Sequence, residues 1–213
     1  MITKNTAFES IRLGLFPKLM KPDGTPGLEI VPGELQIGLV LVTIEEEVPI
    51  TGDDLEAWGV TFDDAYAAAL DNLLARSSRN QLQDVHTVPG MAMYLPGSTD
   101  AASRALVLDD LLEIFPAEGV LFAVPTTDQL LLVPLYDMNS LTAIRVLVTA
   151  THLATQNCTR PLSNQLFWTD GEQITHIPVV HETDNVDILA PPEFLAAVER
   201  LASMSMVAVA GEA

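Results

Sequence analysis

Two consecutive helix starts followed by an amphipathic helix occupy residues 51–74, and this stretch constrains the fold more than any other. Thr51 with Asp54, and Thr61 with Asp64, have the spacing in which a hydroxyl and a carboxylate satisfy the free N–H groups of a helix start. A glycine between the two pairs can adopt the left-handed conformation that ends a helix. The sequence therefore predicts a short helix after Thr51 and a longer one after Thr61.

The longer helix carries one apolar stripe. Its apolar residues recur at intervals of three and four, which is the pattern of a helix that packs against a core. We expect the buried face to consist of Phe62, Tyr66, Ala69, Leu70, Leu73 and Leu74.

The remaining patterns alternate strand pairs with helices. Apolar runs around polar turns predict hairpins within residues 120–135 and 165–180, while helical periodicity covers residues 99–114 and 139–156. This order predicts an α+β fold, in which helices are inserted between the strand pairs of a largely antiparallel or mixed sheet. At 213 residues we expect a single globular domain over residues 1–213. An N-terminal extension, residues 1–33, and a C-terminal helix, residues 191–205, would pack on it.

Composition narrows the functional classes. Acidic residues number 29 against 10 basic ones, and the formal charge of −19 disfavours nucleic-acid binding, which depends on Lys and Arg. No apolar run approaches the roughly 20 residues that cross a bilayer, so we expect no membrane segment. The N-terminus lacks a signal-peptide pattern, and a single cysteine agrees with a reducing compartment. We therefore expect a cytoplasmic protein.

Four short motifs occur in an order that resembles the YtpQ-like family of uncharacterised bacterial proteins. They are ITGDDLEAWG from Ile50, AYAAALDNL from Ala65, AVPTTDQLLL from Ala123 and PLSNQLF from Pro161. The resemblance covers about two thirds of the chain and implies a single cytoplasmic domain. It carries no catalytic residue over to this chain.

His176 and His181, with Glu182 and Asp184 close behind, are the best candidates for a metal site. Imidazole and carboxylate ligands suit zinc or a similar ion. Residues five apart on a strand face opposite sides, however, so the two histidines converge only if the strand ends near Pro178. We therefore expect surface histidines and no bound metal.

Asp128 and Ser163 are the best candidates for a catalytic role. Both occur in polar turns beside apolar strands, where a rigid scaffold can display a side chain. The alternative is that each side chain stabilises its own turn by hydrogen bonds to nearby backbone groups. Cys158 and His152 are six positions apart, a spacing that places them on different faces of a helix and argues against a Cys–His nucleophile. Phosphate-binding glycine patterns are absent from the sequence, and we expect no cofactor.

The steepest local charge asymmetry lies between Glu45 and Asp71, where nine acidic residues occur without any Lys or Arg. It favours a non-enzymatic adaptor that binds a basic protein through Glu46, Asp53, Asp54, Asp63 and Asp64. Two alternatives remain open. The acidity can serve solubility alone, or the chain can be a small hydrolase or metal-dependent enzyme that uses His176, His181 and nearby carboxylates. The sequence does not predict an oligomeric state.

Overall fold

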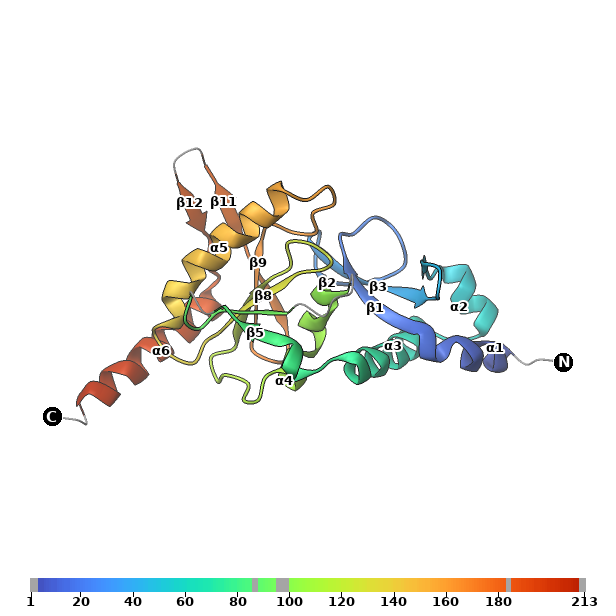
Figure 1. The fold of residues 1–213 in the computed structure, drawn as a ribbon, viewed down its shortest axis with the longest axis horizontal. Helices are drawn as coiled ribbons and strands as arrows, with labels where there is room; N and C mark the ends of the chain where they lie inside the picture. Colours follow the sequence, from blue (N-terminus) through green and yellow to red (C-terminus); the bar gives the residue numbers. More distant parts are fainter. Residues whose placement is uncertain (1–3, 86–87, 95–99, 183–184, 211–213) are drawn as a thin grey trace. The chain divides into compact units, whose positions relative to one another are not determined.

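A computed structural model describes residues 4–85, 88–94, 100–182 and 185–210. The chain divides into two compact units, residues 1–78 and 79–213, which are coloured blue to teal and green to red in Figure 1. Helices alternate with antiparallel strand pairs, so the predicted α+β class is confirmed. Whether the two units unfold together as one domain stays a prediction, which calorimetry tests through the number of transitions.

The first unit is built around a long central strand, β3 (Leu35–Val42). β1 (Leu15–Met20) pairs with one edge of β3, while β2 (Leu28–Val31) and β4 (Glu47–Pro49) pair with the two ends of its other edge. Residues 1–33, which were expected to form an extension, thus supply two strands of this sheet. The other elements are α1 (Lys4–Ile11), η1 (Arg12–Gly14), α2 (Gly52–Trp58) and α3 (Phe62–Arg76).

Both predicted helix starts are confirmed. The hydroxyls of Thr51 and Thr61 accept the backbone N–H groups of Asp54 and Asp64, whose carboxylates in turn accept the threonine N–H groups. Gly59 ends α2 with a φ of 69°. The local sequence therefore determines both the start of each helix and the turn between them.

The buried face of α3 differs in part from the predicted stripe. Its fully buried residues are Ala65, Ala68, Ala69 and Leu73, while the larger Phe62, Tyr66, Leu70 and Leu74 are half-buried. Small alanines allow α3 to lie close to Leu15 and Leu39 of the sheet. The helix is therefore rotated toward its alanine side.

The second unit contains a six-stranded antiparallel sheet in the order β10-β9-β7-β8-β6-β5. Both predicted hairpins are present in it, as β7 with β8 and as β9 with β10. The strands are β5 (Leu82–Asp84), β6 (Ala92–Tyr94), β7 (Val120–Ala123), β8 (Leu130–Pro134), β9 (Leu166–Thr169) and β10 (Ile174–Ile177).

Helices α5 (Ser140–Gln156) and α6 (Pro192–Ala210) pack on one face of this sheet. Leu147 of α5 and Phe194 of α6 belong to the same buried cluster as Leu121 and Trp168 of the strands. Arg200 of α6 also donates a hydrogen bond to the buried Glu118 carboxylate at 2.8 Å. The predicted helices at residues 139–156 and 191–205 are thus confirmed as structural elements, and α6 is the longer of the two.

The helix predicted for residues 99–114 is wrong as one continuous α-helix. Residues 95–99 lie outside the described part of the chain, and the following segment forms a 3₁₀ helix, η3 (Ala101–Val107), and a single turn, α4 (Leu108–Leu111). Val107 interrupts the helical path with φ −136° and ψ 33°. A short 3₁₀ helix, η2 (Arg79–Gln81), opens the unit.

A separate two-stranded hairpin follows the sheet. It consists of β11 (Val179–His181) and β12 (Val186–Ile188), and it lies beside α5 (Figure 1). Across the ranges that the structure describes, every helix is too short or too polar to cross a bilayer.

Candidate functional site

One side of helix α5 faces the β11–β12 hairpin. The helix begins at Ser140. The carboxylate of Asp137, just before this start, accepts the backbone N–H groups of Asn139 and Ser140 at 2.8 and 3.3 Å. Further along, one face of the helix carries four residues with the spacing i, i+3, i+4 and i+7: Arg145, Val148, Thr149 and His152. The first three of these residues line a groove, and the fourth contacts the hairpin.

The hairpin presents an apolar face to this stripe. Val179 lies opposite Ile188, and His181 lies opposite Val186, so these four side chains share one face. Val180 and Asp187 form the opposite pair and point to the other face. Val179 is buried in the core, whereas Val186 and Ile188 remain 44% and 37% exposed.

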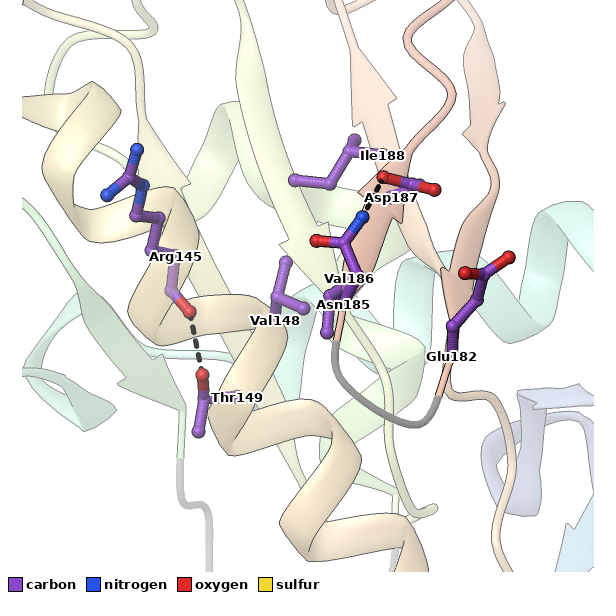
Figure 2. Close-up of a pocket in the computed structure, with 8 residues that line it drawn as sticks. All are labelled: Arg145, Val148, Thr149, Glu182, Asn185, Val186, Asp187 and Ile188. Carbon is purple, nitrogen blue, oxygen red and sulfur yellow. Dashed lines mark hydrogen bonds between the residues drawn. The ribbon is translucent and has the colours of Figure 1, made fainter.

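The groove between helix and hairpin has a volume of about 720 Å³ and is open to solvent. Val148 and Ile188 point toward one another across it in Figure 2 and form its apolar walls with Val186. Its remaining lining residues are polar: Arg145, Thr149, Glu182, Asn185 and Asp187. The arrangement of apolar walls with a polar rim is typical of a binding site.

Strand β12 exposes one backbone edge at this groove. The N–H of Glu182 donates to the carbonyl of Asn185, and the N–H of Leu189 donates to that of Pro178, each at 2.9 Å. In an antiparallel pair, residues in the hydrogen-bonded set alternate with residues whose N–H and C=O groups point outward. The backbone groups of Val186 and Ile188 therefore point away from β11. Within the described ranges, β12 pairs with no strand besides β11.

Two histidines join the helix to the hairpin. The rings of His152 and His181 stack with their centroids 4.0 Å apart and their planes 22° from parallel. Burial, and then the neighbouring His152, lower the pKa of His181. Nδ1 of His152 and Nε2 of His181 are buried without a hydrogen-bond partner in the part of the chain that the structure describes.

The stacked geometry does not suit a metal ion. Lone pairs on imidazole nitrogens lie in the ring plane, so those of two nearly parallel rings about 4 Å apart do not converge at the 2.0–2.1 Å that zinc requires. His176 lies elsewhere, beside the Phe167 ring, with its Nε2 3.4 Å from Oε1 of Gln165. The structure thus does not bring His176 and His181 together. The described ranges contain no group of three His, Cys, Asp or Glu residues that could hold a metal, and Asp184 lies outside them.

Asp128 and Ser163 lie on neighbouring segments. The N–H groups of Leu162 and Ser163 donate to the carbonyls of Pro125 and Val124, which places the two turns side by side. Each side chain nevertheless stabilises its own turn, because Asp128 accepts the hydroxyl of Thr126 and Ser163 accepts the N–H of Gln165. This is the alternative that the sequence left open. Ser163 is also 3% exposed, so its hydroxyl is inaccessible to a substrate.

The five predicted partner-binding acids fall into two groups. Asp54 and Asp64 cap α2 and α3, and the hydrogen bonds from the capping threonines lower the pKa of each carboxyl group. Glu46, Asp53 and Asp63 are exposed, and no ion pair neutralises them among the side chains that the structure describes. Three of the five are therefore solvent-exposed carboxylates, and their binding of a basic partner stays a prediction.

The sequence did not predict the groove. The hairpin predicted within residues 165–180 ends before His181, and the sequence pattern predicts no strand over residues 181–190. A usable signal is the alternation of apolar and acidic residues from Val186 to Ile188, but three residues are too few to establish a period.

Comparisons with known proteins identify no relative. No family model, curated protein or solved structure matches the chain. The resemblance to the YtpQ-like family therefore stays a prediction.

Proposed function

We propose that this chain is a non-enzymatic adaptor protein of the cytoplasm that holds a segment of another protein in the groove between α5 and β12. The single observation that carries the proposal is the groove itself. Val148, Val186 and Ile188 form its apolar walls, and polar side chains form its rim. Exposed apolar surface with a polar rim marks interaction sites on proteins.

The proposed partner is basic. The charged residues that line the groove are two acids, Glu182 and Asp187, and one base, Arg145, and the chain as a whole carries a formal charge of −19. Exposed acids at Glu46, Asp53 and Asp63 add to the negative field. Such a field raises the rate of encounter with a cationic protein and opposes binding of nucleic acid.

The alternative of a hydrolase or metal-dependent enzyme has no observation in its favour. His176 and His181 contact different residues, and the Asp128 and Ser163 side chains are engaged in their own turns. We therefore retain the adaptor as the proposal.

A photo-crosslinking amino acid at position 188 tests the proposal. Expressed in the native host, the variant should yield a discrete crosslinked protein upon irradiation. The matched control places the same amino acid at position 114, where the exposed isoleucine, 70% accessible, does not line the groove. Products that are identical at both positions, or absent at 188, would refute binding in the groove.

A further inference from the structure

The open edge of β12 has a donor and acceptor pattern that matches an extended chain. Val186 and Ile188 each direct an N–H and a C=O away from β11, two residues apart, which is the repeat of a strand. Natural proteins usually protect such edges with a charge that points inward, a proline or a covering segment. Between Val186 and Ile188 the charged side chain is Asp187, and it lies on the opposite face of the hairpin.

From this edge we infer that the groove accepts an extended segment of a basic protein as an added third strand beside β12. The inference rests on the proposed function and specifies the conformation of the bound segment. Backbone hydrogen bonds to Val186 and Ile188 supply affinity, and side chains on alternate positions supply specificity. With a rise of about 3.3 Å per residue, β12 is long enough to pair three or four residues of the segment.

The two faces of the hairpin determine the composition of the segment. On the face toward α5, its side chains meet Val148, Val186 and Ile188 and should be apolar. On the other face they lie beside Asp187, where lysine or arginine forms a favourable cross-strand pair. The recognised segment therefore alternates apolar and basic residues.

Charge argues against a second copy of this chain as the occupant. Pairing two β12 edges would bring the Asp187 side chains of both copies together, and each copy already carries a charge of −19. Like charges across neighbouring strands are destabilising. A bound helix is also disfavoured, because it would leave the outward N–H groups of β12 without partners.

The first experiment selects ligands from a phage-displayed library of random linear 12-residue peptides against the full chain. We expect enriched peptides to alternate apolar residues with Lys or Arg. An enriched pattern with a period of three to four residues would overturn the inference in favour of a bound helix. No enrichment, together with no crosslink from position 188, would overturn both this inference and the proposed function.

The second experiment leaves the protein unchanged. The strongest enriched peptide is synthesised with a single N-methyl group at each position in turn, and its binding is measured by fluorescence polarisation. In an added strand, only alternate N–H groups of the three or four paired residues face β12, so affinity should fall about tenfold at alternate positions within that stretch and little at the other positions. A uniform response would refute strand addition, while the proposed function would survive if the peptide still crosslinked at position 188.

Variants of β12 complete the test. Ile188→Pro removes an outward N–H but retains apolar bulk, and the β11–β12 ladder does not use that N–H. We expect binding to weaken about tenfold. The conservative variant Ile188→Val retains the N–H and should recover most of the binding that Ile188→Pro loses, and both variants should keep the parent's melting temperature. A concentration-dependent dimer in sedimentation that is lost in Ile188→Pro would instead identify a second copy as the occupant.

Discussion

Gly119 occupies a position where no side chain fits. Its φ is +81°, and a Cβ atom there would lie 2.2 Å from the carbonyl oxygen of Thr169 and 2.6 Å from Nε1 of Trp168. The same indole donates a hydrogen bond to the carbonyl of Glu118 at 3.0 Å. The turn before β7 thus packs directly on the backbone of β9.

We predict that Gly119→Ala lowers the free energy of unfolding by about 3 kcal/mol or more, since it combines backbone strain with overpacking. The matched control is Gly90→Ala, which has the same φ of +81° but only ordinary contacts with Ser140. The control should cost about 1 kcal/mol from strain alone. Urea unfolding of both variants measures the difference, and equal losses would contradict the packing argument.

The stacked histidines predict a pH dependence of stability. Because the pKa of His181 lies below its ordinary value of about 6.5, the folded state binds fewer protons than the unfolded state just below pH 6.5. The stability from the neutral ring is therefore complete above pH 6.5 and is lost as the pH falls through the lowered pKa. His152 faces His181 from α5, with Gln156 beside it, while Glu182 and Asp187 are exposed on the hairpin.

His181→Phe retains a stacked ring and removes one titrating group. We expect its free energy of unfolding to fall less between pH 7.5 and 5.5 than that of the parent, as measured by urea unfolding at several pH values. Carboxylates elsewhere contribute the same background to both proteins. Parallel curves for the two proteins would exclude His181 as the source of the dependence.

At the scale of elements, two leucines of α3 that the sequence pattern placed on the same buried face differ in burial. Leu73 is fully buried, whereas Leu70 is half-buried. We predict that Leu73→Ala costs about 3 kcal/mol of unfolding free energy and Leu70→Ala about 1 kcal/mol, since the loss follows the apolar area removed from water and the cavity that remains. Thermal or urea unfolding of both variants provides the test, and a larger loss at position 70 would mean that the buried face is assigned wrongly.

Elements with strong local signals were predictable from sequence. The capping boxes at Thr51 and Thr61 and the β7–β8 hairpin depend on residues only a few positions apart. The buried face of α3 was not fully predictable, because close approach to a sheet favours alanine over the bulkier residues that dominate a hydrophobic pattern. The break at Val107 was not predictable either, because no glycine or proline lies in residues 101–115 to mark it.

At the scale of the whole molecule, the candidate groove could not be predicted from the sequence. Its walls come from Val148 of α5 and from Val186 and Ile188 of β12, which follow 38 and 40 residues later in the sequence. The helix and the hairpin are joined by the ring contact between His152 and His181. No pattern in the sequence around either histidine predicts that the two rings are in contact. A strand as short as β12 gives little periodic signal in the sequence, and the sequence does not show that one of its edges is left without a neighbouring strand.

The acidic run of the first unit, between Glu45 and Asp71, leads to a prediction about how salt affects partner binding. If Glu46, Asp53 and Asp63 steer a basic partner, their attraction should weaken as the Debye length falls from about 10 Å at 0.1 M salt to about 3 Å at 1 M. We predict that a variant with all three changed to lysine loses the partners that the parent retains from host lysate at low salt.

A control variant with the same change in net charge at other positions separates the effect of where the charges lie from the effect of how many there are. It changes the exposed Glu29, Glu172 and Glu199 to lysine, which alters the net charge by the same amount but leaves the acidic run intact. Because local fields depend on where charges lie, this control should retain the partners at low salt, and both variants should match the parent at high salt, where screening removes the attraction. Equal retention by the parent and both variants at each salt concentration would show that the acidic run serves hydration alone, and binding would then depend on the groove of the second unit.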